Sequence, residues 1–127
     1  MAGKTVCAAA EGAPSVIAPP PAWIETPAKS RWLAYGSYCW KTTCVDMIPP
    51  QSRPDLPSLG VAHASTARVH LGIAATSISV SISKVRVRVR LDAAKRTLSW
   101  RATRGGIAVV SVRGSGDASY VIRLRVH

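Results

Sequence analysis

The sequence predicts an all-β domain: an antiparallel β-sandwich of six to seven short strands, preceded by a Pro/Ala-rich tail. Cationic and aliphatic residues alternate without a break over residues 84–91. An extended strand would place the two kinds of side chain on opposite faces, whereas a helix would spread the charges around its circumference. Further apolar or alternating runs follow at about ten-residue spacing with turn residues between them, which favours a sandwich over a barrel.

Residues 1–30 are expected to form the flexible tail. Between residues 8 and 30 the chain is rich in Ala and Pro and shows neither the period of a strand nor that of a helix. Such a segment cannot bury enough apolar surface to offset its conformational entropy. We therefore expect residues 31–127 to form the folded domain, and roughly the first 28 residues to be dispensable for its stability.

The strands are expected to begin at residue 31. The first covers residues 31–40, where aromatic residues lie on both faces, and a Pro-rich loop follows over residues 49–60 because Pro cannot donate to a central ladder. Between Ile82 and Val85 the apolar positions change from even to odd numbers, so this run is two strands or one bulged strand. The strands expected after the loop are 67–71, 77–83, 84–91, 97–102, 107–113 and 119–126.

The chain is strongly basic, and the excess charge lies in its C-terminal part. It has 17 Lys and Arg against six Asp and Glu, a formal net charge of +11, and residues 84–127 hold 11 of the cations. Alternate cations on the strand 84–91 would form a solvent-facing row about 7 Å apart. Such a row either keeps a strand soluble or binds an anionic surface, polymer or acidic protein. The residues of this expected anion-binding face are Lys84, Arg86, Arg88 and Arg90.

Three cysteines leave several possibilities open. Cys39 and Cys44 flank four residues, a hairpin-loop length that would place them opposite each other, so a disulfide would fit. Half of a metal site and two reduced buried cysteines are the alternatives. Cys7 precedes the tail, where a lipid-bearing cysteine would lie, but no hydrophobic region comes before it, so a plain free thiol is favoured for the chain as written.

No catalytic, cofactor or metal signature emerges from the sequence. His63 and His70 are the only internal histidines, and no candidate aspartate lies close to either in the sequence. Their candidate partners would be Asp46, Asp92 and Asp117. We expect the protein not to be an enzyme and to carry no cofactor and no metal.

The sequence also lacks the signals of membrane insertion and export. No stretch approaches the roughly 18 consecutive apolar residues of a membrane helix, and the first residues contain no hydrophobic signal core. We therefore expect no transmembrane segment. The location would be cytoplasmic if the chain is complete, and the cell envelope or the extracellular space if its true start lies upstream.

Three short motifs connect the chain to a group of known proteins. These are Gly36-Ser37-Tyr38-Cys39-Trp40, Cys44-Val45-Asp46 and Gly116-Asp117-Ala118-Ser119-Tyr120-Val121. Over residues 31–127 the chain resembles small bacterial envelope proteins and lipoproteins that carry a compact β-sandwich behind a signal peptide and a tether. The resemblance implies a structural pair of Cys39 and Cys44, a possible lipid anchor at Cys7, and no catalytic activity.

Two classes of function remain. The first is a non-enzymatic module of the cell envelope that binds an anionic partner or has a structural role. The alternative is a small basic β-domain that binds nucleic acid, with Arg86, Arg88 and Arg90 on backbone phosphates. Proteins that bind single strands interleave stacking aromatics with cations. Trp100 and Tyr120 fall on the aliphatic phase of their strands, which counts against the alternative.

Overall fold

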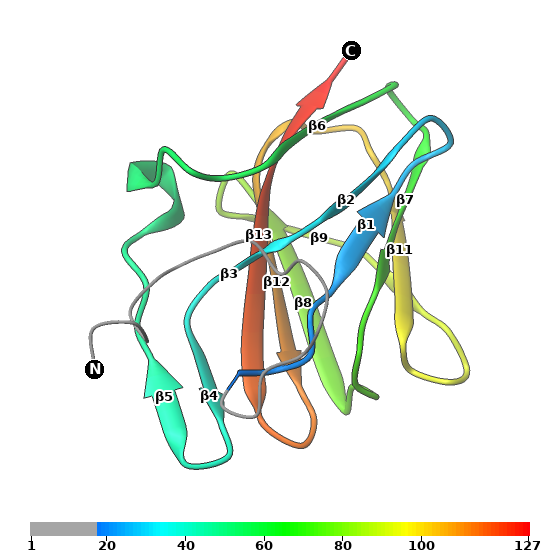
Figure 1. Cartoon of the computed structure of the whole chain (residues 1–127). Helices are drawn as coiled ribbons and strands as arrows, with labels where there is room; N and C mark the ends of the chain where they lie inside the picture. Colours follow the sequence, from blue (N-terminus) through cyan, green and yellow to red (C-terminus); the bar gives the residue numbers. More distant parts are fainter. Residues whose placement is uncertain (1–17) are drawn as a thin grey trace.

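Two sheets pack face to face in the computed structural model of the chain, which describes residues 18–127 (Figure 1). The predicted all-β sandwich is confirmed. One sheet has the order β10 (Arg90–Leu91), β11 (Thr97–Arg101), β7 (Thr66–His70), β1 (Trp23–Glu25), β2 (Ser30–Trp32). The other has the order β5 (Thr43–Val45), β4 (Tyr38–Trp40), β13 (Asp117–Val126), β12 (Gly106–Arg113), β8 (Ser77–Ile82), β9 (Val85–Val87). Two further strands, β3 (Ala34–Tyr35) and β6 (Ser58–Val61), also pair with β13.

The pairing is antiparallel except between β13 and β6, which run parallel. The described residues form thirteen strands rather than the expected six to seven. Two predicted strands, 31–40 and 84–91, are divided into pieces of two or three residues, and β1, β5 and β6 were not predicted, β6 beginning inside the expected loop 49–60. Strands this short carry too little sequence to show a period of their own.

The core lies between the sheets and follows the alternation in the sequence. On β8, Val80 and Ile82 point into the core, while Ser79 and Ser81 lie on the outer face. The inward residues of β12 and β13 repeat the pattern, and Tyr120 at the centre is completely buried. Alternate apolar residues therefore form one continuous layer, and the polar residues between them face outward.

The phase change between Ile82 and Val85 is a tight hairpin. Ile82 pairs with Val85, and the two residues between them, Ser83 and Lys84, have φ angles of 51° and 67°. Positive φ at both central residues is the geometry of the two-residue turns that match the twist of antiparallel strands. Of the two predicted possibilities, the structure has two strands.

Residues 84–91 do not form the single strand that their alternation predicted. β9 ends at Val87 in the eight-stranded sheet, and β10 begins at Arg90 in the five-stranded sheet. Figure 1 shows this segment running from one sheet towards the other. Val87, Val89 and Leu91 still pack against the core. These three aliphatic residues therefore still face the core and the cations of the segment still face outward, although β9 and β10 belong to different sheets.

Residues 31–40 cross between the sheets in the same way. The predicted strand is divided into β2, which pairs with β1, and β3 and β4, which pair with β13. At the crossing point Leu33 is completely buried, and its backbone N–H donates to the carbonyl of Ala22 at 3.0 Å. Strands that change sheets at bends are the usual corners of a sandwich.

The predicted start of the domain at residue 31 is too late. β1 lies between β7 and β2 in the five-stranded sheet, and Ala22 and Ile24 are completely buried. Pro19 and Pro20 are also engaged, since their carbonyls accept hydrogen bonds from Tyr35 Oη at 2.7 Å and Tyr120 Oη at 2.6 Å. Residues 1–17, with Cys7 among them, lie outside the described part of the chain.

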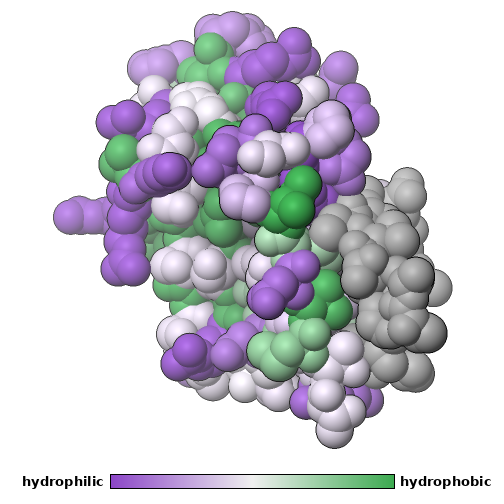
Figure 2. Space-filling view, turned by 90° about the vertical axis from the view of Figure 1, so that its left-hand side faces the viewer, coloured by the Kyte–Doolittle hydropathy of each residue, from purple (hydrophilic) through white to green (hydrophobic). Residues whose placement is uncertain are grey.

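The loop after β5 covers part of the outer face of the eight-stranded sheet. It contains a short 3-10 turn (Pro50–Ser52), and its Leu56 packs with Ala34 and Val121 in a second small apolar cluster. Arg53, only 2% exposed, donates to the carbonyl of Tyr35 at 2.6 Å and pairs with Asp55. From the side on which β5 lies, hydrophobic residues appear in separate patches between hydrophilic ones (Figure 2).

We predict that Ile24→Ala lowers the free energy of unfolding by about 2–4 kcal/mol, because it removes a completely buried side chain and leaves a cavity. Lys29→Ala, an exposed change five residues further along, should leave the free energy of unfolding within about 0.5 kcal/mol of the wild-type value. Denaturant unfolding of both variants measures the difference. Equal, small effects would show that β1 is not part of the folded unit.

A second prediction concerns Tyr120 and the stability of the fold at alkaline pH. Burial, and then the neighbouring Tyr35, raise the pKa of the Tyr120 phenol well above its usual value. The unfolded chain therefore loses this proton first, near pH 10, so the stability that the neutral phenol provides is present below about pH 10 and lost above it. Tyr120→Phe should cost about 1 kcal/mol at neutral pH and make the loss of stability above about pH 10 less steep. Unfolding of both proteins at neutral and alkaline pH tests this, and equal slopes would contradict it.

Candidate functional site

A strongly cationic concavity lies on the outside of the five-stranded sheet. It is a hollow of about 700 Å³ between residues 87–90 and the strands β7 and β11. Four arginines line it: Arg68, Arg88, Arg90 and Arg101. We call it the arginine hollow.

The strand register brings three of these side chains together. Arg90 lies opposite Ser99, and Ser99 lies opposite Arg68 on the next strand, so the three residues form one row across β10, β11 and β7. Neighbouring strands are about 4.8 Å apart, which places the Cα atoms of Arg90 and Arg68 about 10 Å from each other. Arg101 lies two residues beyond Ser99 on the same face of β11, and Arg88 approaches from the segment that joins the two sheets.

The charge of the hollow is not neutralised by its neighbours. Within residues 18–127, the ion pairs join Arg53 to Asp55, Arg113 to Asp117 and His70 to Glu25, and none involves an arginine of the hollow. Another acid, Asp92, accepts the backbone N–H groups of Arg96 and Thr97 at 2.9 and 3.0 Å, and these bonds lower its pKa. Four like charges around one concavity therefore produce a positive potential that attracts anions.

An aromatic group adjoins the arginine hollow on the same face. The indole of Trp23 stacks on the imidazole of His70, with ring centroids 3.9 Å apart and an angle of 14° between the planes. The Nε2 atom of His70 lies 2.6 Å from Oε1 of Glu25. His70 is thus held by Glu25 and not by any of the aspartates considered from the sequence. His63 donates its backbone N–H to the carbonyl of His127.

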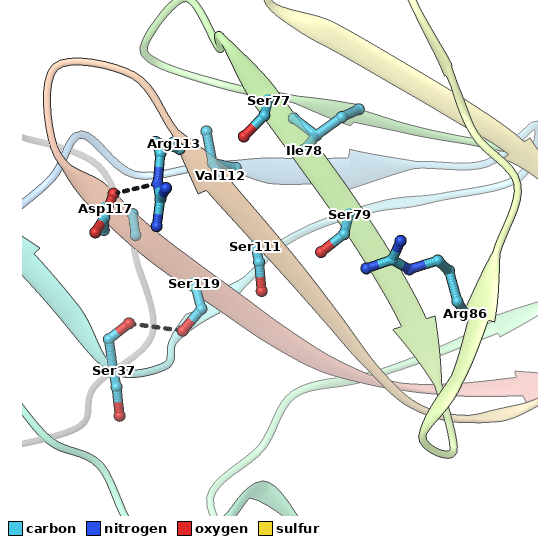
Figure 3. Close-up of a pocket in the computed structure, with 11 residues that line it drawn as sticks. Ser37, Ser77, Ile78, Ser79, Arg86, Ser111, Val112, Arg113, Asp117 and Ser119 are labelled. Atoms are coloured by element: carbon cyan, nitrogen blue, oxygen red, sulfur yellow. Dashed lines mark hydrogen bonds and ion pairs between the residues drawn. The ribbon is translucent and has the colours of Figure 1, made fainter.

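A second hollow, of about 510 Å³, lies on the outer face of the eight-stranded sheet and is lined mainly by serines (Figure 3). Ser79, Ser111 and Ser119 lie opposite one another across β8, β12 and β13. Arg86 reaches towards this row from β9. We call it the serine groove.

The serine groove is suited to hydrogen bonding. Ser119 Oγ donates to the carbonyl of Ser37 at 2.7 Å. Asp117, the acidic residue among those that line the groove, accepts from Arg113 Nε at 3.1 Å (Figure 3). With its carboxylate engaged by Arg113, Asp117 is a poor base for a neighbouring hydroxyl.

The cations expected to form one face are therefore divided among three places. Arg88 and Arg90 line the arginine hollow, Arg86 lines the serine groove, and Lys84 lies in the exposed β8–β9 turn. All four side chains are exposed. The predicted single row is wrong because the chain changes sheets between Val87 and Arg90.

Sequence reasoning missed half of the arginine hollow. Arg68 lies on a strand that was predicted, with its neighbours Ala67 and Val69 buried, so its outward direction could have been inferred. The same holds for Arg101, which shares the outward phase of Thr97 and Ser99. The proximity of Arg68 and Arg101 to Arg88 and Arg90 could not have been inferred from the sequence, because it depends on which strands are neighbours in the sheet.

Cys39 and Cys44 form a disulfide between the paired strands β4 and β5, with Cα atoms 4.0 Å apart. Trp40 pairs with Thr43, so the connecting turn has two residues, not the four that the spacing indicated. In residues 18–127 no cluster of three or more His, Cys, Asp or Glu could hold a metal ion. The described chain also contains no helix long and apolar enough to cross a membrane.

Comparison of the chain with protein-family models, curated proteins and solved structures finds no match.

We predict that replacing both Cys39 and Cys44 by Ala lowers the free energy of unfolding by about 2 kcal/mol, the value for releasing a six-residue ring in the loop-entropy model. Thiol labelling of the denatured, unreduced wild-type protein should modify one cysteine, Cys7. If all three cysteines are labelled in protein from an oxidising compartment, the disulfide prediction is wrong.

Proposed function

We propose that the protein is a non-enzymatic binding module whose arginine hollow binds an anionic polymer, surface or acidic protein. The observation that supports this is the convergence of four arginines, from three strands and a crossing segment, on one concavity, while none of the ion pairs among the described residues involves them. Unpaired like charges gathered at one place repel one another and are not needed for solubility, for which scattered charges suffice.

The chemistry of arginine favours phosphate, sulfate or carboxylate groups as ligands. A guanidinium is planar, stays charged at all physiological pH values, and presents paired N–H donors that match two oxygens of such a group. With Arg68 and Arg90 about 10 Å apart, the hollow can hold more than one anionic group. An extended anion with repeated charges would therefore occupy it better than a single small ion.

The proposed location is the bacterial cell envelope. The Cys39–Cys44 disulfide supports an oxidising compartment. The envelope is also rich in anionic surfaces and polymers, which the arginine hollow would contact. A lipid on Cys7 would anchor the module there.

The test compares two double variants with the same loss of charge. Arg88→Gln with Arg90→Gln removes two cations of the arginine hollow, and Arg123→Gln with Arg125→Gln removes two exposed cations of β13. We expect the first to weaken binding to a model polyanion, such as long-chain polyphosphate, by about tenfold or more at low salt and to reduce the salt dependence by about one to two released counterions. The second should have a much smaller effect.

Two results would overturn the proposal. If both double variants weaken binding equally, the protein responds to net charge and not to a site. If the wild-type protein binds neither polyphosphate nor anionic vesicles at low salt, the arginine hollow has no role in binding polyanions.

A further inference from the structure

The outer face of the five-stranded sheet carries one exposed and one half-buried tryptophan on the same side as the arginine hollow. Trp23 and Trp32, together with Ser30 and Arg31, line a separate hollow of about 380 Å³ at the β1–β2 end of the sheet. We call it the tryptophan pocket. Trp32 is 39% exposed, a large value for an indole in a domain of this size.

The register shows that tryptophans and arginines lie on one continuous face. Trp32 lies opposite Trp23, and Trp23 lies opposite His70, forming a row across β2, β1 and β7. The neighbouring row, two residues away along each strand, runs from Ser30 through Glu25, Arg68 and Ser99 to Arg90. Two residues along a strand are about 7 Å, and four strand spacings are about 19 Å. Aromatic groups near the β2 edge and cationic groups towards the β10 edge therefore share one face about 19 Å wide.

The tryptophan pocket is preorganised. The Trp23 indole is stacked on His70, and His70 is in turn held by Glu25, so the ring plane of Trp23 is set by two neighbours on β7 and β1. A fixed ring loses little conformational entropy when a second flat group stacks nearby. Arg31 also lines the pocket, although it lies opposite the buried Ile24 and so in the other phase of β2.

We propose that this face binds single-stranded nucleic acid, with backbone phosphates at the arginine hollow and an unpaired base in the tryptophan pocket. The inference rests on the proposed anion-binding function and names its ligand. A ligand that uses both hollows must carry anionic groups and flat unsaturated rings at short repeated intervals. Membrane surfaces and acidic peptides supply the charge without the rings, and a duplex keeps the faces of its bases inside the stack.

In the sequence analysis, the requirement for exposed aromatics among the cations counted against nucleic-acid binding. Trp100 and Tyr120 are indeed buried, at 4% and 0% exposed, although Trp100 also lines the arginine hollow. The aromatics that meet the criterion are Trp23, which was assigned to the tail, and Trp32, which was assigned to a separate strand. Pairing of β1 with both β2 and β7 brings them next to Arg68.

Glu25 provides a sharp internal test because it lies opposite Arg68 in the register, between the tryptophans and the arginines. Its carboxylate would face the path of the phosphates. Glu25→Gln removes the negative charge and keeps an oxygen that can accept from His70. We expect this variant to bind an oligonucleotide about two- to fivefold more tightly at low salt, since a repulsive charge is removed.

The main experiment measures fluorescence anisotropy of a labelled oligothymidine of about 12 nucleotides. We expect Trp32→Ala to weaken binding by about 5- to 100-fold, because one base loses its stacking partner, while the salt dependence stays unchanged. Trp32→Phe should restore most of the affinity. Ile48→Ala, which truncates another exposed apolar residue, is the matched control and should bind as the wild type does.

Competition separates the possible ligands, using a duplex of mixed sequence, polyphosphate, a sulfated polysaccharide and anionic vesicles. The inference predicts that unlabelled single strands compete best. It is overturned if polyphosphate or the polysaccharide competes equally and Trp32→Ala changes nothing, a result that leaves the proposed function standing. Binding of no polyanion overturns both.

A variant that fails to fold does not block the test. Wild-type protein alone should show quenching of tryptophan fluorescence when the oligonucleotide is added, because a base that stacks on an indole quenches its emission. Polyphosphate should cause no such quenching. Equal quenching by both, or by neither, would contradict stacking in the tryptophan pocket.

Discussion

Burial of one apolar layer between two sheets is the constraint on which the rest of the structure depends. Each strand that borders the layer must turn its aliphatic side chains inward, so the residues between them are forced outward. The serines of β8 and the arginines of β7, β10 and β11 are consequently displayed on opposite outer faces of the sandwich. The functional surfaces are thus a consequence of the packing of the core.

The two crossing segments determine which outward residues become neighbours. Near Leu33 the chain leaves the five-stranded sheet, and near Arg88 it enters it. The first crossing leaves Trp32 on the edge strand β2, and the second brings Arg88 and Arg90 to the opposite edge. Between these edges lie β1, β7 and β11, whose outward residues complete the tryptophan pocket and the arginine hollow.

Four of the five acids in residues 18–127 bond to other groups, and none of the ion pairs involves an arginine of the hollow. Asp92 ties the β10–β11 turn to backbone amides, and Asp55 accepts from Arg53, a hydrogen bond that lowers the pKa of this carboxyl. Asp117 pairs with Arg113 on the far sheet. Glu25 is the acid closest in register to the hollow, and its carboxylate bonds to His70. A chain with few acids, most of them committed elsewhere, therefore presents a positive face.

The sequence by itself determined the all-β class, the outward direction of alternate residues such as Ser79 and Arg90, and the phase change between Ile82 and Val85. It also showed that a disulfide between Cys39 and Cys44 would fit, with other states left open. Each of these depends on contacts within a few residues, which a local period or spacing records. Only the tertiary structure decided that β1 belongs to the domain, that Arg86 is separated from Arg88 and Arg90, and that Trp23 and Trp32 adjoin Arg68. These outcomes depend on pairing between strands about 45 residues apart, such as Trp23 with His70. A three-residue strand has no period of its own, and its place is set by the partners that bury Ile24.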